Sequence, residues 1–169
     1  MFRAILLLLA ISGAANAQTL DELERREAAV VEAWNAAPLT LRNAVFVTEH
    51  PQGFGQYTER SNNVFAKDEK LVVYAEPVGY GWKDIGKGQY EFGLMVDFLI
   101  KSPDGKVLTG QENFANLDMK SHARNREFMV VLTLSVEGAP PGDYVLEYKL
   151  HDIASEKTAS VDLPFKIAQ

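Results

Sequence analysis

The stretch Gln89–Lys101, which reads QYEFGLMVDFLIK, decides the fold class of this 169-residue chain. Its apolar residues recur with a period of two, which places their side chains on one face of an extended strand. The residues Ser102–Gly105 (SPDG) have turn chemistry, because proline presets φ and glycine tolerates a positive φ. The chain is therefore predicted to return antiparallel over 106–112. The inward-facing residues of the long strand are Tyr90, Phe92, Leu94, Val96, Phe98 and Ile100.

The same period continues through most of the chain after Pro38. Alternating apolar positions recur in the C-terminal third, and two earlier segments are rich in β-branched and aromatic residues. Turn signals separate most of these segments, so an antiparallel β-sandwich over residues 39–169 is the simplest prediction. The predicted strands cover 39–49, 70–76, 89–101, 106–112, 127–136, 143–151 and 158–167.

The last hairpin carries a family resemblance. Residues Ala139–Tyr144 (APPGDY) open an alternating strand that runs to Asp152, and Leu163–Ile167 (LPFKI) ends the strand after it. This pattern resembles the final hairpin of bacterial immunoglobulin-like and fibronectin-type-III-like domains. The resemblance implies an immunoglobulin-like sandwich of about seven strands in which the Tyr144 hydroxyl contacts the preceding corner backbone. It implies no chemistry, since this architecture hosts many functions.

A second resemblance lies in residues 55–77. Gly55–Tyr57 (GQY), Phe65, Glu69 and Val73–Pro77 (VYAEP) look like the opening of small exported β-domains of Gram-negative bacteria, which are uncharacterised proteins. This resemblance implies no activity.

Residues 1–17 are predicted to be a cleaved signal peptide. Arg3 supplies a positive start, Ala4–Ile11 is apolar, and Ala15–Ala17 (ANA) is a small-x-small cleavage site. The apolar run is too short to span a bilayer, which needs about 20 residues, and no cysteine is available for lipid attachment. We therefore expect a periplasmic or secreted protein without a stable membrane anchor.

Residues 18–38 are predicted to form an amphipathic helix. Thr19 and Glu22 have the spacing of a capping box, and Pro38 ends the helix by favouring an extended conformation at the residue before it. The helix has an apolar stripe, which we expect to cover an apolar outer sheet face in the same chain or across a homodimer. The stripe comprises Leu20, Leu23, Val30, Val31 and Trp34, and the sheet face Gly93, Met95, Leu99, Met129, Val131 and Val145.

The charge balance indicates which partners to expect. Arg3 is the one charged residue of the predicted signal, so the mature chain carries a net charge of −7. Nucleic acids and anionic membranes attract clustered Lys and Arg, so neither is expected as a partner. The lack of cysteine also excludes disulfides and Cys-ligated zinc.

No motif for catalysis or cofactor binding is recognisable. His50, His122 and His151 lack metal-ligand spacing, although Met119 near His122 leaves copper binding as an alternative. Gly-x-Ser-x-Gly is absent, while a carboxylate pair among Asp97, Glu112 and Glu127 stays open. We therefore expect a protein that is not an enzyme and has no cofactor or metal.

The candidate binding residues lie in the loops predicted at 77–88 and 113–126. Tyr80 and Trp82 either form a contact surface or fold back to plug one end of the sandwich. His122 and Arg124 belong to the polar cluster Ser121–Arg126 (SHARNR), which either receives a carboxylate or a sugar or pairs internally with Glu127 or Asp118. The predicted function is an exported non-catalytic binding or assembly module. The alternatives are a small-ligand or carbohydrate-binding domain and a hydrolase with an unidentified site.

Overall fold

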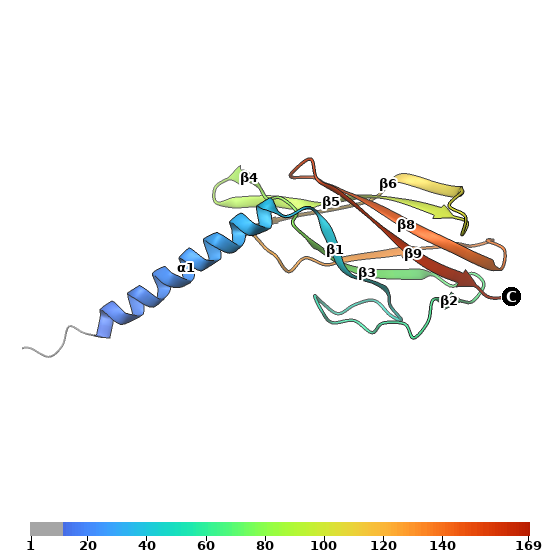
Figure 1. The fold of residues 1–169 in the computed structure, drawn as a ribbon, viewed down its shortest axis with the longest axis horizontal. Coiled ribbons are helices and arrows are strands. Elements are labelled where there is room, and N and C mark those ends of the chain that lie inside the picture. The colour runs from blue at the N-terminus through green and yellow to red at the C-terminus, as the bar shows by residue number, and fades with distance from the viewer. Residues whose placement is uncertain (1–11) are drawn as a thin grey trace, which may run out of the picture. The chain divides into compact units, whose positions relative to one another are not determined.

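A computed structural model describes residues 12–169, with side chains described from residue 19 onward. The chain divides between Ala36 and Ala37 into two compact units, a helix and a β unit. The described part is mainly β with one helix, which confirms the fold class at that level (Figure 1).

The helix α1 spans Ser12–Ala36. It begins earlier than predicted, so Thr19 lies inside it and is not its N-cap; this prediction was wrong because the preceding SGAANAQ residues are also helical. Within the helix, Glu22 pairs with Arg25 at 2.6 Å and with Arg26 at 2.7 Å. Residues 1–11 of the predicted signal lie outside the described residues. No helix in the described range is long and apolar enough to cross a membrane.

The predicted apolar stripe lies on α1, where Leu20, Leu23 and Val30 are exposed. In the β unit, Met95, Leu99 and Val145 of the predicted second apolar face are half-buried. The suggestion that the helix stripe covers this face stays a prediction.

The β unit contains nine strands in two sheets in the described range. The smaller sheet has the order β1-β3-β7, and the larger one has the order β2-β9-β8-β5-β4, with β6 paired to β5. The long strands β5, β8 and β9 run beside one another in Figure 1. The strands are β1 (Thr40–Phe46), β2 (Val64–Phe65), β3 (Leu71–Val78), β4 (Lys83–Gly86), β5 (Gln89–Lys101), β6 (Val107–Ser121), β7 (Val130–Leu134), β8 (Gly142–Asp152) and β9 (Thr158–Ile167).

The larger sheet is mixed, which corrects the prediction of a wholly antiparallel fold. The short strand β2 runs parallel to β9. It is held there because Lys166 N donates to Asn63 O at 2.9 Å and Ala168 N donates to Phe65 O at 2.8 Å. Two residues with no clear alternation carry too little pattern to reveal such a strand in the sequence.

The core contains the residues that the two-residue period places inside. Phe92, Leu94 and Val96 of β5 are fully buried, as predicted. The aromatic rings of the two sheets meet where Phe46 of β1 lies 6.3 Å from Phe165 of β9, edge to face. Such ring contacts add to the stabilisation from apolar burial. The two sheets therefore share one core.

The strand β6 corrects a predicted boundary. The sequence indicated a strand over 106–112 and a loop over 113–126, whereas β6 runs to Ser121. It pairs with β5 alone and forms an edge of the larger sheet, so both faces of β6 are largely exposed and its sequence does not alternate. A bulge opposite Asp97 interrupts it: Asn113 has φ 53°, its N–H donates to Asp97 Oδ1 at 2.8 Å, and the next ring, Phe114, packs 4.9 Å from Phe98.

Two further contacts explain motifs in the sequence. The Tyr144 hydroxyl donates to Pro140 O at 2.7 Å, as the resemblance of the last hairpin implied. In the segment 55–77, the Tyr74 hydroxyl accepts from Gly55 N at 2.7 Å and donates to the buried Glu76 at 2.8 Å, while Tyr57 stacks on the Tyr74 ring at 4.1 Å. These residues thus attach a long loop to the core.

Candidate functional site

The four predicted binding residues come together at one end of the β unit. Tyr80 and Trp82 lie between β3 and β4, and His122 and Arg124 follow the end of β6. The β4–β5 hairpin and β6 position them, because both β4 and the end of β6 pair with the start of β5. The loop after β6 is shorter than predicted, and the polar cluster 121–126 comprises the last residue of β6 and the first residues of this loop.

Tyr80 is a core residue, and its prediction as a contact residue was wrong. Its side chain is fully buried, and its ring lies 5.7 Å from Phe92 and 5.6 Å from Phe128. These rings leave an apolar opening at the end of the two sheets, which Tyr80 fills. Burial raises the pKa of the Tyr80 hydroxyl, which donates to Asn125 O at 2.7 Å.

Trp82 takes an intermediate position. The indole is half-buried, its ring lies 5.7 Å from Tyr80, and Nε1 donates to Asn125 O at 3.0 Å. One backbone carbonyl therefore receives two aromatic donors. Of the two alternatives, Tyr80 folds back into the end of the core, whereas part of the Trp82 ring remains exposed to solvent.

The loop 121–126 is fastened to the β4–β5 turn as well as to the core. His122 Nδ1 lies 3.1 Å from Gly88 O, and His122 Nε2 lies 3.3 Å from Gln89 Nε2. A carbonyl can only accept and an amide NH₂ can only donate, so a neutral ring with its hydrogen on Nδ1 satisfies both contacts. Ser121 Oγ accepts from Ala123 N at 3.0 Å and bonds Asn125 Oδ1 at 3.2 Å. This loop is held at both ends before any partner arrives.

Arg124 is the exposed centre of the cluster. Its guanidinium carbon lies 4.7 Å above the centroid of the Tyr90 ring, a cation–π contact. The predicted internal pairing with Glu127 or Asp118 does not form: no ion pair among residues 12–169 includes Arg124 or Arg126. An exposed guanidinium without a carboxylate partner can bind a carboxylate of another molecule. We call the group Trp82, Tyr90, His122 and Arg124 the Arg124 surface.

Sequence reasoning missed Asn125 and Tyr90 as parts of this site. Asn125 acts mainly through its backbone carbonyl, which no side-chain pattern reports. Tyr90 was assigned to the inward face of the long strand, where it lies, but at the strand's end this face continues past the core and is half-exposed.

A histidine–carboxylate contact occurs elsewhere, on the larger sheet. His151 Nε2 lies 2.9 Å from Asp97 Oδ2. Burial alone would raise the pKa of Asp97, but the hydrogen bond from Asn113 N and the contact with His151 outweigh it and hold this pKa below its ordinary value. Asp97 and Glu112 line one hollow of about 290 Å³, as the proposed carboxylate pair required, but Glu127 is not part of it. Asp97 also anchors the β6 bulge, so it has a structural role.

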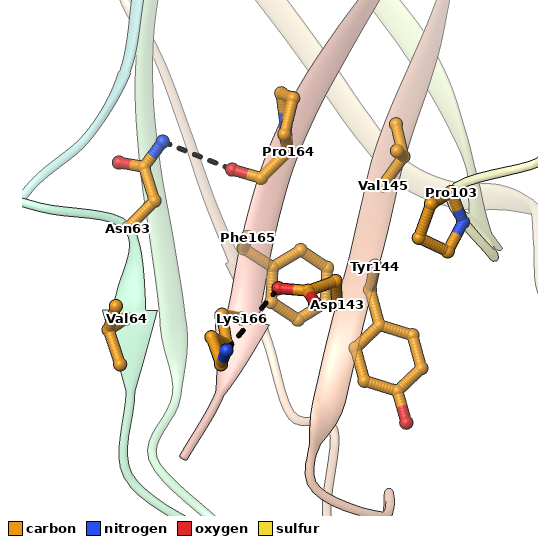
Figure 2. A pocket seen from close by; sticks show the side chains of 9 residues that line it. All are labelled: Asn63, Val64, Pro103, Asp143, Tyr144, Val145, Pro164, Phe165 and Lys166. Carbon is orange, nitrogen blue, oxygen red and sulfur yellow. Dashed lines mark hydrogen bonds and ion pairs between the residues drawn. The ribbon is translucent and has the colours of Figure 1, made fainter.

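A shallow hollow of about 370 Å³ lies over β8 and β9 (Figure 2). The half-buried Tyr144 lines it, Pro103 closes one side, and Phe165 lies beneath it in the core. Asp143 and Lys166 form a loose ion pair across it at 3.8 Å, and both side chains are more than half exposed. Among the described residues, no group of three or more His, Cys, Asp or Glu could hold a metal ion.

Comparisons with known proteins give little. No protein-family model matches the chain, and no curated protein matches it. A solved structure of the alkylpurine DNA glycosylase AlkC from Pseudomonas fluorescens, bound to DNA containing an abasic-site analogue, is similar at 12% identity and a TM-score of 0.30. The similarity covers 79% of this chain and 31% of that one.

This similarity corrects one expectation. The charge balance excluded nucleic-acid partners, whereas the matching structure is of a protein bound to DNA. The exclusion is withdrawn. A TM-score of 0.30 is too low to assign a fold, an activity or DNA binding to this chain.

Proposed function

We propose that this protein is an exported, non-catalytic binding or assembly module that uses the Arg124 surface. The observation that carries the proposal is an exposed arginine, paired with no carboxylate of the described residues, on a loop whose two ends are held by hydrogen bonds. Arg, Trp and Tyr are the residue types most enriched among the energetic centres of interfaces. The Arg124 surface contains all three.

The fastening of the loop favours binding. A flexible loop loses conformational entropy when a partner orders it, which weakens the complex. Here Asn125 O is held by Tyr80 and Trp82, and His122 is held by Gly88 and Gln89, so little ordering remains.

Export and an immunoglobulin-like architecture are parts of the same proposal. The segment 1–17 with its Ala15–Ala17 cleavage site supports export. The two sheets with a common core and the contact of the Tyr144 hydroxyl with Pro140 O support a relationship to bacterial immunoglobulin-like domains. The parallel pairing of β2 with β9 is a departure from that pattern.

The experiment is capture of partners from a periplasmic extract of the source bacterium. Wild type is compared with Arg124→Glu, which reverses the exposed charge, and with Lys106→Glu, a matched reversal on an exposed residue of the β5–β6 turn. We expect a partner that Lys106→Glu retains and Arg124→Glu loses. Equal recovery by all three proteins would contradict the proposed surface.

The hollow over β8 and β9 supports a second candidate, binding of a small ligand or carbohydrate. A sugar ring could stack on Tyr144 while Asp143 and Lys166 bond its hydroxyls, since aromatic platforms with a few polar groups suit such ligands (Figure 2). Titration with methyl glucoside, followed by NMR, would then shift the amides of Tyr144 and Lys166, and Tyr144→Ala would abolish the shifts. Unchanged spectra up to tens of millimolar would reject this candidate.

A further inference from the structure

We infer that the Arg124 surface binds the carboxylate of an aspartate or glutamate in an acidic peptide segment of a partner protein. This inference rests on the proposed function and names the chemistry of its ligand. Its starting point is a second arginine of the β unit, Arg60, which stacks on an aromatic ring and pairs with a carboxylate of the same chain.

Arg60 is the internal counterpart of Arg124. Its guanidinium carbon lies 4.2 Å above the Phe65 ring, and Nη1 donates to Glu69 Oε1 at 2.7 Å. The ring and the carboxylate act together, because a ring beneath the guanidinium fixes its plane while the N–H groups at its edge remain available to an oxyanion. At Arg60, an arginine stacked on an aromatic ring thus also pairs with a carboxylate.

Arg124 has the ring but lacks the carboxylate. Its guanidinium lies over Tyr90 at 4.7 Å, and no carboxylate of the described residues pairs with it. The nearest acidic residues of the hairpin are otherwise engaged: Glu91 pairs with Lys120 at 3.4 Å, and Asp84 accepts from Gly86 N at 2.8 Å. Any carboxylate that binds Arg124 is therefore supplied by another molecule.

A carboxylate fits better than a phosphate polyanion. A polyanion gains affinity by contacting many cations at once. A single planar carboxylate needs only the fork of one guanidinium.

The surroundings also favour an apolar residue beside the acidic one. Met119 is 42% exposed, and its register partner is Phe92, so it lies on the same sheet face as Tyr90. The half-exposed Trp82 indole supplies apolar surface as well. The expected ligand is therefore an acidic side chain followed or preceded by an apolar one in an extended peptide.

The test uses NMR titration of the full chain with two matched peptides, Ac-Gly-Glu-Leu-Gly-NH₂ and Ac-Gly-Gln-Leu-Gly-NH₂. We expect the Glu peptide to shift the amides of 122–125 and to bind about tenfold more tightly, the scale of one charge-assisted hydrogen-bond pair. Arg124→Gln should remove this preference, and Arg124→Lys should reduce it because the planar fork is lost. Lys106→Gln serves as the control and should keep it.

The remaining outcomes overturn the inference in distinguishable ways. If both peptides shift 122–125 equally, the surface binds but not through a carboxylate, and the proposed function stands. If inorganic phosphate or the oligonucleotide d(T)8 binds there in preference to the Glu peptide, the ligand is a phosphate. If no probe shifts these amides, the carboxylate inference is wrong, and the capture experiment alone decides the proposed function.

Discussion

Two loops of the β unit are each fastened by a buried tyrosine hydroxyl, yet they present different surfaces. In the loop after β1, Tyr74 holds Gly55, and the arginine of that loop, Arg60, pairs with Glu69. In the loop after β6, Tyr80 holds Asn125, and within residues 19–169 Arg124 has no carboxylate partner. The comparison shows that a tyrosine hydrogen bond can hold a loop in place whether or not the arginine of that loop is paired with a carboxylate. Where both are done, the loop has a structural role, and where only the first is done, we propose that the loop binds a partner.

The largest expected effect comes from breaking the first loop's anchor. Glu76 is buried and accepts from the Tyr74 hydroxyl at 2.8 Å and from Asn43 Nδ2 at 3.0 Å. Glu76→Ala leaves the buried Tyr74 hydroxyl without its acceptor and removes the bond from the exposed Asn43, so we expect a loss of about 3 kcal/mol in the free energy of unfolding. Urea denaturation followed by tryptophan fluorescence measures it. A loss below about 1 kcal/mol would show that this anchor is not needed.

Alkaline pH should weaken the same anchor. Burial first, and then the neighbouring Glu76, raise the pKa of Tyr74 to about 12. Its pKa in the unfolded chain is about 10, so this residue's contribution to stability is complete below pH 10 and is lost as pH rises from 10 to 12. The loss is about 2 kcal/mol. Between pH 9, 10.5 and 12, the free energy of unfolding should fall less steeply in Tyr74→Phe than in wild type. Parallel curves for the two proteins would show that the Tyr74 hydroxyl does not cause the loss.

At the second loop, Tyr80→Phe should have a smaller effect. The ring and its packing remain, and Trp82 still donates to Asn125 O, so about 1 kcal/mol of stability is lost. Hydrogen exchange at 122–125 should become faster, because the loop loses one of its anchors. If exchange is unchanged while stability falls, the hydroxyl supports the core but does not order the loop.

The smallest effect on stability belongs to Arg124. Arg124→Gln removes an exposed group with no ion pair, so we expect a change below about 0.5 kcal/mol. Glu69→Gln, which removes the partner of Arg60, should cost more, about 1 kcal/mol. Thermal unfolding of the two variants checks the order. An equal loss in both would mean that Arg124 has a structural role like that of Arg60.

The sequence predicted those parts of this molecule in which one strand face is buried. The alternation of β5 placed Phe92, Leu94 and Val96 correctly because each fills the core. It failed for β6, which pairs through its backbone at an exposed edge, where side chains of any type are tolerated. The bulge at Asn113 depends on a hydrogen bond to Asp97, a residue 16 positions away, and local pattern cannot show it.

The candidate site was also predicted only in part, because residue types are visible in the sequence, whereas burial and backbone contacts depend on the fold. Residue types suggested that Trp82, His122 and Arg124 belong to one surface, and the fold brings them together. The burial of Tyr80 could not be decided from the sequence, because an aromatic loop residue faces inward only if the sheets leave an opening for it. The role of Asn125 O was also hidden, since any residue carries a backbone carbonyl.

The central claim is that the fastened loop 121–126 meets a partner through Arg124. The most direct measurement is photo-crosslinking in the periplasm from a benzoylphenylalanine placed at Ala123, an exposed neighbour of Arg124, with the same group at Lys106 as control. We predict a crosslinked protein from position 123 that disappears with Arg124→Glu and is absent from position 106. Identical products from both positions, or a product at 123 that survives Arg124→Glu, would contradict the account.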